Sequence, residues 1–208
     1  MMIFIVLLGC VASIVATTCP SGMAIASNVA TKTIPATLPQ FLSIVGSFLN
    51  SSWYSTLGPI SFGADNQVGT IRTTVDFTNN SRLYNETLMI YNLNSTYFEQ
   101  IWKGPGNEGV FIPLGDFNLG SYVEYLNGQS TCGGSAVIVN FGSDSCVTNV
   151  TLAVPALTAN HMWGIEQVQS LLKIGNFTKC SAVANSMKFN SLFIYISFGI
   201  IFKFYVRI

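Results

Sequence analysis

The sequence predicts an α+β protein in which a short strand and a helix precede a run of antiparallel strands and a final helix. Apolar residues recur at helical spacing in residues 38–49 and again after Pro155. Between these segments lie β-branched and aromatic runs that are separated by polar turns, with no helical pattern among them. Of the 208 residues, 50% are hydrophobic and 12% are aromatic, which excludes a disordered chain and suffices for one domain with a sizeable core.

A proline predicts where the opening strand ends, and the helical spacing of apolar residues predicts the first helix. Residues 28–34 are expected to form the strand, which Pro35 ends. A helix over residues 38–49 would bury one apolar face. That face consists of Phe41, Ile44, Val45, Phe48 and Leu49. Residues 50–63 are rich in turn formers, so no regular element is expected there.

The central strands begin with a hairpin. Residues 68–77 and 82–92 are β-branched and aromatic runs on either side of a polar, Asn-rich turn. Residues 97–102 predict a third strand, and the glycine-rich residues 104–109 predict a loop.

A second hairpin and the closing helix complete the domain. Strands over residues 121–126 and 135–141 are expected to meet at an Asn127-Gly128 turn. The helix is expected to hold Pro155 in its first turn and to run to about Ile174. Its buried stripe would be Met162, Ile165, Val168 and Leu172.

Residues 1–18, MMIFIVLLGCVASIVATT, are typical of a secretory signal peptide because an apolar run passes into small residues. Cleavage after Thr17 or after Ala24 fits this pattern. The uninterrupted apolar stretch is shorter than the ~20 residues that cross a bilayer. Residues 19–180 are then expected to form one extracellular domain.

The apolar tail over residues 192–208 has three interpretations, ranked here in order. A lipid-anchor signal would use Ser181 as the attachment site, residues 181–191 as the spacer and the tail as the removed segment. A single span over residues 189–208 would place Lys203 and Arg207 on the cytoplasmic side. The third interpretation is a tail without an anchoring role.

Four cysteines remain once Cys10 is assigned to the signal peptide. In a secreted chain they suggest two disulfides with three possible connectivities. We expect Cys19 to pair with Cys180, because they lie at the two edges of the domain. Cys132 and Cys146, which flank a glycine-rich segment, form the second expected pair.

Six Asn-x-Ser/Thr sequons agree with secretion and mark positions that should face water. They lie at Asn50, Asn79, Asn85, Asn94, Asn149 and Asn176. Charged residues make up 9% of the chain, and nine Lys+Arg offset nine Asp+Glu. This balance excludes a basic nucleic-acid-binding surface.

Four segments of the chain resemble the START-like, Bet v 1-like (SRPBCC) helix-grip superfamily, in particular its polyketide-cyclase and secreted branches. They are TIPATLPQFLSIVGSFLNSSWY, VGTIRTTVDF, YNETLMIYNLNSTYFEQIW and STCGGSAVIVNF. The matching residues are the Pro-led helix near a Trp (Pro35, Pro39, Trp53), a Gly-x-x-Arg strand (Gly69, Arg72) and a Tyr-x-Glu-x-Leu strand (Tyr84, Glu86, Leu88).

The resemblance covers roughly residues 28–174. It implies a curved antiparallel sheet of about six to seven strands that grips a C-terminal helix over an apolar cavity. The closing helix looks short for the family, and the four cysteines are an addition to its pattern.

The hairpin register predicts which side chains would face such a cavity. If Asn79-Asn80 is a two-residue turn, the opposed pairs are Thr73 with Glu86, Val75 with Tyr84, and Ile71 with Leu88. A glycan on Asn85 would face water, so alternation turns Tyr84, Glu86, Leu88 and Ile90 inward and places Arg72 on the outer face beside Thr87. Glu86 is then a polar anchor on an apolar face. If the turn has one more residue, or Asn85 carries no glycan, Glu86 lies in solvent instead.

The remaining motifs do not predict a cofactor site or a metal site. Residues 104–109 match GxGxxG, but VFIPLG follows instead of the helix that a dinucleotide site requires, so no cofactor is expected. One histidine, His161, and the absence of a CxxC motif make a metal site unexpected. The acidic residues Asp65, Asp76, Asp116 and Asp144 are isolated and form no calcium loop.

We expect a secreted or surface-anchored glycoprotein that binds a small apolar ligand in an internal cavity without catalysis. The expected ligand-binding residues are Ile71, Thr73, Val75, Tyr84, Glu86, Leu88, Trp102, His161 and Ile165. One alternative is a cyclase- or hydratase-like enzyme with Glu86 or His161 as general acid or base. The other is a structural or interaction protein of the cell surface whose own aromatic residues fill the interior. Partners beyond a ligand and the membrane are not indicated, and the oligomeric state is open.

Overall fold

The computed structural model describes residues 18–54, 57–75, 83–105, 112–114 and 116–180, with side chains omitted at a few strand ends. The chain divides into two units, residues 1–177 and 178–208, and every described helix and strand lies in the first. The expected signal peptide up to residue 17, Asn79, Ser181 and the apolar tail lie outside the described residues. Among the helices that are described, none is both long and apolar enough to cross a membrane.

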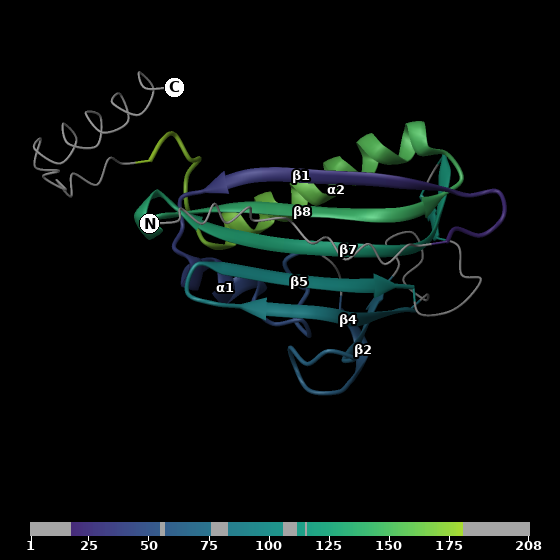
Figure 1. Cartoon of the computed structure of the whole chain (residues 1–208), viewed down its shortest axis with the longest axis horizontal. Helices are drawn as coiled ribbons and strands as arrows, with labels where there is room; N and C mark the ends of the chain where they lie inside the picture. Colours follow the sequence, from purple (N-terminus) through teal and green to yellow (C-terminus); the bar gives the residue numbers. More distant parts are fainter. Residues whose placement is uncertain (1–17, 55–56, 76–82, 106–111, 115, 181–208) are drawn as a thin grey trace, which may run out of the picture. The chain divides into compact units, whose positions relative to one another are not determined.

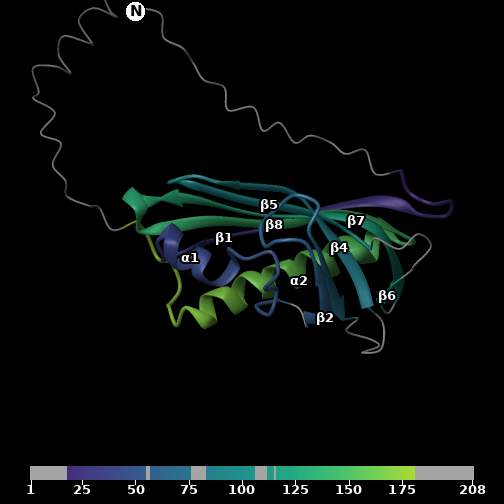
Figure 2. The same ribbon diagram turned by 90° about the horizontal axis from the view of Figure 1, so that it is seen from below.

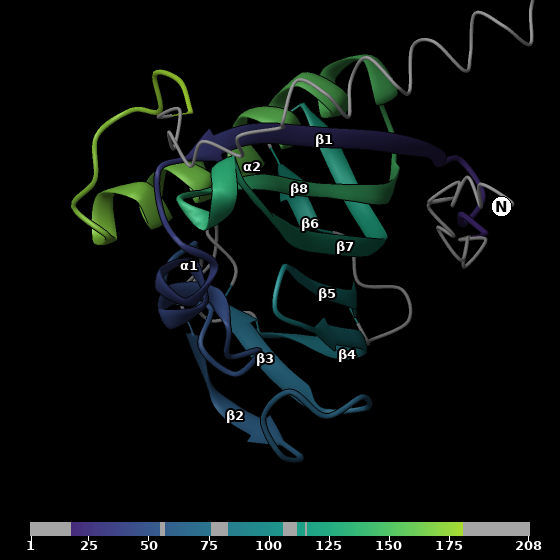
Figure 3. The ribbon, with the colours of Figure 1, turned by 60° about the vertical axis from the view of Figure 1, so that its left-hand side comes forward.

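One antiparallel sheet forms the framework of the first unit (Figure 1). Its strands are β1 (Ala24–Ile34), β2 (Leu57–Phe62), β3 (Ile71–Val75), β4 (Leu83–Leu93), β5 (Tyr97–Gly104), β6 (Ile112–Leu114), β7 (Phe117–Thr131) and β8 (Ala136–Val147). Their order across the sheet is β1-β8-β7-β5-β4-β3-β2, and β6 pairs with β7 alone. The helices α1 (Leu38–Val45) and α2 (Val150–Leu171) lie on the same side of the sheet (Figure 2). The sheet curves between β1 and β2, so its concave face is turned towards the helices (Figure 3). The expected α+β class and helix-grip arrangement are confirmed.

Helix α1 begins where the sequence provides a capping box. The Thr37 hydroxyl accepts a hydrogen bond from the Gln40 backbone N–H, and the Gln40 side chain accepts one from the Thr37 backbone N–H. Phe41 and Val45 are buried, as expected. The helix ends at Val45 rather than at residue 49, but Phe48 is still buried beyond that end.

The expected Asn127-Gly128 turn is wrong, because both residues lie inside the long strand β7. Gly128 is opposite Phe98 of β5 and Val139 of β8. A Cβ atom there would lie 2.8 Å from the Phe41 ring, so the glycine makes room for α1 on the sheet. The chain instead turns at the one-turn helix η1 (Cys132–Gly134), where Cys132, Gly133 and Gly134 have positive φ. Strands β2 and β6 were not expected.

Helix α2 begins earlier than expected. Asn149 is its N-cap and accepts a hydrogen bond from the Leu152 backbone N–H. Pro155 therefore lies within the helix rather than in its first turn, and the helix ends at Leu171. Ile165 and Val168 are buried as expected, and Met162 and Leu172 pack against the core as partly buried residues.

The β3–β4 register is shifted by one residue from the expected one. Arg72 lies opposite Glu86, and Ile71 lies opposite Thr87. The inward orientation of Tyr84, Glu86 and Leu88 was predicted correctly, since all three are buried. The assignment of β3 was wrong: the assumed Asn79-Asn80 turn, which lies outside the described residues, had placed Thr73 opposite Glu86. That shift brings Arg72 to the inner face beside Glu86, so the two buried charges neutralise each other.

The described sequons lie at accessible positions. Asn50, Asn94 and Asn176 are exposed, and Asn85 and Asn149 are half-buried.

The disulfide pairing differs from the expected one. Cys19 is bonded to Cys146, with an S–S distance of 2.09 Å, which excludes both Cys19–Cys180 and Cys132–Cys146. Cys132 and Cys180 are also disulfide-bonded. The reason lies in the sheet: Cys19 precedes β1, and β1 runs antiparallel to β8, which contains Cys146.

Peptide mapping of the unreduced protein should therefore recover the Cys19 peptide linked to the Cys146 peptide. In the chain-entropy model a cross-link over 127 residues of sequence stabilises the fold by about 5 kcal/mol. The C19S/C146S variant should lose a free energy of unfolding of this order in urea titrations. Recovery of Cys19 with any other cysteine would contradict the pairing.

Candidate functional site

A row of polar side chains crosses the inner face of the sheet. Asn28 of β1 is opposite Ser143 of β8, Ser143 is opposite Glu124 of β7, and Glu124 is opposite Trp102 of β5. Strand alternation gives all four the same face. Helix α2 places His161 over this row, and His161 is fully buried. The row therefore lies between the sheet and the helix.

A buried ion pair lies on the neighbouring strands. Arg72 Nε donates to Glu86 Oε2 at 2.7 Å, and each side chain is 3% exposed. The remaining donors of Arg72 reach the Phe48 carbonyl oxygen at 2.7 Å and the Tyr54 hydroxyl oxygen at 3.2 Å. The second oxygen of Glu86 accepts a hydrogen bond of 2.7 Å from the Tyr122 hydroxyl.

Aromatic rings enclose the guanidinium of this pair. It lies 4.4 Å from the centre of the Phe48 ring and 4.9 Å from that of the Trp102 ring, within cation–π range. Burial, the largest single influence, lowers the pKa of Arg72, but the charge of Glu86, the neighbouring Tyr54, the hydrogen bond to Glu86 and the charge of Glu124 together outweigh it, so the net shift is upward. Burial raises the pKa of Glu86, and Arg72 opposes that shift.

Tyr54 connects the ion pair to the polar row. Its hydroxyl accepts from Arg72 and donates to Glu124 Oε2 at 3.4 Å. Trp102 Nε1 donates to the same oxygen at 2.9 Å. Burial, followed by the charge of Glu124, raises the pKa of Tyr54 well above its usual value. Burial, followed by the charge of Glu86, does the same for Tyr122.

The hydrogen bonds of His161 define which ring nitrogen faces which neighbour. Asn28 Nδ2 lies 3.2 Å from the Ser143 carbonyl oxygen, which can only accept, so Asn28 Oδ1 faces His161. His161 Nδ1, 2.6 Å from that oxygen, is therefore an N–H donor. His161 Nε2 lies 3.1 Å from Glu124 Oε1, so the imidazole is held between β1 and β7 by both ring nitrogens.

The inner face has two different halves. Near α1 it is filled by aromatic rings: Trp53, Tyr54, Trp102 and Phe141 have ring centres 4.5 to 6.4 Å apart. Towards the Val147 end of β8 the inner face of the sheet carries small residues. Two of them are Ala26 of β1 and Ser145 of β8, which lie opposite each other.

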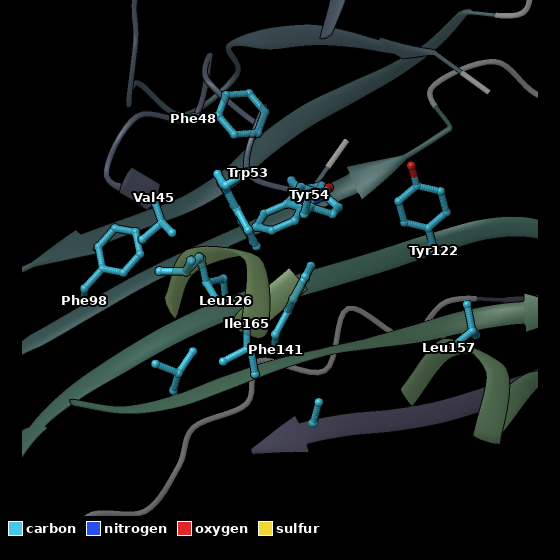
Figure 4. Packing of buried hydrophobic residues seen from close by; sticks show 14 of the residues in the cluster. Val45, Phe48, Trp53, Tyr54, Phe98, Tyr122, Leu126, Phe141, Leu157 and Ile165 are labelled. Carbon is cyan, nitrogen blue, oxygen red and sulfur yellow. The ribbon is translucent and has the colours of Figure 1, made fainter. Parts of the chain in front are cut away.

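Helix α2 presents apolar side chains of small and medium size to this second half. The helix starts three residues after β8 and runs back along it, so Ala153 and Leu157 lie nearer to this end than His161 does. Figure 4 shows Tyr122 and Leu157 apart from the aromatic group.

The structure brings some of the predicted ligand-binding residues to this interior and not others. Tyr84, Glu86, Leu88, Trp102, His161 and Ile165 are at most 5% exposed. Thr73 is buried on the face of β3 opposite to Arg72, Ile71 is half-buried, and the Val75 side chain lies outside the description. Glu86 and His161 bond to different groups and are linked through Arg72, Tyr54 and Glu124.

Sequence reasoning missed Asn28, Tyr54, Arg72 and Glu124 as members of this site. One of them carried a readable signal. Glu124 shares strand parity with Tyr122 and Leu126, which is the same pattern of a carboxylate on an apolar face that singled out Glu86.

No protein-family model and no curated protein matches the sequence. Solved structures match the fold. An uncharacterized protein from Bacillus thuringiensis aligns with TM-score 0.52 and 13% identity, over 71% of this chain and 99% of its own. The protein XoxI from Bacillus cereus aligns with TM-score 0.51 and 13% identity, over 71% and 96%. Norcoclaurine synthase from Thalictrum flavum aligns with TM-score 0.49 and 13% identity, over 73% and 88%, a likeness that indicates nothing about activity here. The chain has the Bet v 1-like helix-grip fold.

The Arg72–Glu86 pair should behave as a buried unit. R72M leaves a carboxylate without its cation and E86Q leaves a cation without its anion, so each should lower the free energy of unfolding by about 3–5 kcal/mol. The R72M/E86Q double variant should lose less than the sum of the two, as measured by urea unfolding. The exposed pair Lys32–Glu166 is the matched control, and K32M or E166Q should cost about 0–1 kcal/mol. Additive losses at Arg72 and Glu86 would contradict the coupling.

Stability should fall at alkaline pH because of Tyr54 and Tyr122. Their folded-state pKa values are raised well above 10.0, whereas an unfolded tyrosine ionises near ~10. The unfolded state therefore loses protons first, so the free energy of unfolding is fully present below pH ~10 and decreases above it. The decrease should be smaller in Y122F than in the wild type. If the folded Y122F variant showed less tyrosinate absorbance than the folded wild type near pH ~10, Tyr122 would be ionising in the native state. That result would contradict the raised pKa of Tyr122.

Proposed function

We propose that this protein binds a small, largely apolar molecule between the sheet and α2, and does not change it chemically. The observation that carries the proposal is the exposure of Glu124. Its side chain is 14% exposed on the inner face, although its partners His161, Tyr54 and Trp102 are at most 5% exposed. An accessible carboxylate among buried rings suits a site in which apolar burial gives affinity and one polar group gives orientation.

The ligand would lie against the half of the inner face that carries Ala26 and Ser145, with Glu124 at its edge. Ala26 and Ser145 are at most 1% exposed, so a ligand would have to separate this half of the sheet from Leu157 of α2, which supplies an apolar surface opposite them. Tyr122 and the adjoining ion pair would border the ligand on the side of β4.

Binding is favoured over the acid–base alternative by the partners of the candidate acids and bases. Both ring nitrogens of His161 bond to protein atoms, as do both carboxylate oxygens of Glu86. A general acid or base needs an atom within reach of the substrate. The purely structural alternative is less well supported, since an aromatic-filled interior does not require an accessible Glu124.

We also propose that the domain is secreted, glycosylated and held at the cell surface through its C-terminal segment, with a lipid anchor at Ser181, which replaces the apolar tail, ranked before a single span over residues 189–208. Disulfides such as Cys19–Cys146 persist mainly in oxidising compartments. The accessible positions of the described sequons support the same route.

The test is mass spectrometry of small molecules that are released when the protein secreted by eukaryotic cells is denatured. The wild type should carry an apolar compound. A26L, and to a smaller degree A26V, should lose it, because the added side chain occupies the proposed site. S27L is the matched control, since Ser27 is the next residue of β1 and is exposed on the other face.

Circular dichroism would show that each variant is folded. Folded A26L that retains the compound at the wild-type level would contradict the location. A wild-type protein that neither carries a compound nor binds the neutral dye N-phenyl-1-naphthylamine would contradict the function.

A further inference from the structure

We propose that two copies of this protein associate through the outer side of α2, with the two helices running antiparallel. The contact surface is the outer stripe, which consists of Leu152, Ala156, Ala159 and Trp163. The outer stripe lies on the side of α2 opposite to the buried His161. The inference therefore goes beyond the proposed ligand binding and does not depend on it.

Helix α2 is apolar on the side that faces solvent as well as on the side that packs against the sheet. Leu152 is 43% exposed and Trp163 is 45% exposed, and Ala156 and Ala159 between them are exposed as well. The sequence has no Asp, Glu, Lys or Arg from residue 145 to residue 165. A helix on the surface of a monomer ordinarily carries charged residues on its outer side. The outer stripe is therefore a surface that a partner should cover.

The four residues form one continuous stripe because of their helical spacing. At about 100° per residue they fall within an arc of about 60° and extend over about 16 Å of the helix. The two alanines lie in the middle of the stripe, and the two large side chains lie at its ends. The middle is thus a shallow depression into which a second helix can fit closely.

The spacing of the stripe is the same in both directions, which favours a second copy as the partner. The steps from Leu152 to Trp163 are four, three and four residues. In an antiparallel pair with two-fold symmetry, Leu152 lies opposite Trp163 of the partner subunit, and Ala156 lies opposite Ala159 of the partner subunit. The alanines allow the helices to approach at the centre, and a leucine–tryptophan contact closes each end.

The charge next to the stripe favours the antiparallel arrangement. Glu166 is the first charged residue after the stripe, and the two-fold symmetry places it opposite Asn149 of the partner subunit, which is uncharged. In a parallel pair Glu166 would lie opposite Glu166 of the partner subunit, and the two carboxylates would repel each other. A membrane surface is a less suitable partner, because helices that lie on bilayers are rich in lysine and arginine and α2 contains neither.

The contact should be weak, because it extends over only about three turns of each helix. Interfaces of this small size have dissociation constants on the order of 10 µM. The sequon at Asn149 lies one turn before Leu152, so a glycan there would add bulk beside the end of the stripe. T151A removes the sequon but keeps the N-cap side chain of Asn149, and it should associate at least as tightly as the wild type.

Trp163 gives a direct measurement of the association. It is the exposed one of the three tryptophans, since Trp53 is 4% exposed and Trp102 is 1% exposed. In the protein secreted by eukaryotic cells, acrylamide quenching of tryptophan emission should decrease as the protein concentration rises through the dissociation constant. Sedimentation velocity over the same concentrations should show monomer giving way to dimer.

Charge exchange tests the antiparallel register. A156E and A159K should each weaken dimerisation at least about tenfold, because each would bury an unpaired charge. An equimolar mixture of the two should associate at least about tenfold more tightly than either alone, because the introduced carboxylate then lies opposite the introduced ammonium. L93E is the matched control, since Leu93 is 50% exposed on β4, and it should associate as the wild type does. Circular dichroism would show that each variant is folded.

The outcomes identify what covers the stripe. Wild type and T151A that both stay monomeric with an accessible Trp163 would contradict the inference. A monomer in which Trp163 is already shielded would show that the chain itself or a glycan covers the stripe. Neutral phospholipid vesicles that shield Trp163 of a monomer would identify a membrane surface instead.

Two further results would contradict the proposed contact. A dimer that persists in A156E and A159K would be formed by another surface. Variants whose mixture associates no more tightly than each alone would exclude the antiparallel register. Each of these results leaves the proposed ligand binding unchanged, because the stripe lies outside the interior.

Discussion

A guanidinium inside an apolar domain is the constraint on which much of this structure depends. Arg72 is 2% exposed, and an uncompensated charge at such a position would cost about 3–5 kcal/mol, a large share of the ~5–15 kcal/mol that stabilises a typical domain. Its donors reach three groups in two parts of the chain: Glu86 on β4, and both the Phe48 carbonyl and Tyr54 in the segment between α1 and β2. The ion pair therefore holds the segment between α1 and β2 against the sheet. A structure that lost this pairing would lose the position of that segment as well.

The polar row extends the same requirement across the sheet to the helix. The Tyr54 hydroxyl accepts from Arg72 and donates to Glu124, Glu124 contacts His161 Nε2, and His161 Nδ1 donates to Asn28 of the edge strand β1. Each of these groups is satisfied by the next, as burial demands. The row lets α2 dock on the sheet in one orientation, because His161 has partners on both ring nitrogens only when it lies between β1 and β7. Shape alone would specify the docking less strictly, since Gly164 and Ile165 offer a smooth apolar surface.

The sequence predicted the fold better than the site, for a physical reason. Local patterns predicted α1 from its apolar spacing and placed Glu86 inward from strand alternation. They failed where distant contacts matter: Gly128 pairs with β5 and β8 inside β7, and the Phe41 ring packs over it, so the Asn-Gly pair forms no turn. Pro155 likewise does not mark the start of α2, because the N-cap Asn149 sets that start earlier. The partner of Glu86 depended on a one-residue register across an unpredicted loop length, and the Glu124–His161 contact joins residues that no local pattern relates.

The persistence of this network in an otherwise apolar interior argues for a role beyond stability. Buried ion pairs and polar chains can often be replaced by apolar side chains of the same volume at no cost to the free energy of unfolding. The Arg72–Glu86 pair alone could serve to orient the segment after α1. The Glu124–His161 pair is different, because it lies at the border between the filled and the small-residue halves and keeps part of one carboxylate accessible. Partial exposure lowers the desolvation cost of that carboxylate, and it also leaves the carboxylate open to a bound molecule, as the proposed binding function requires.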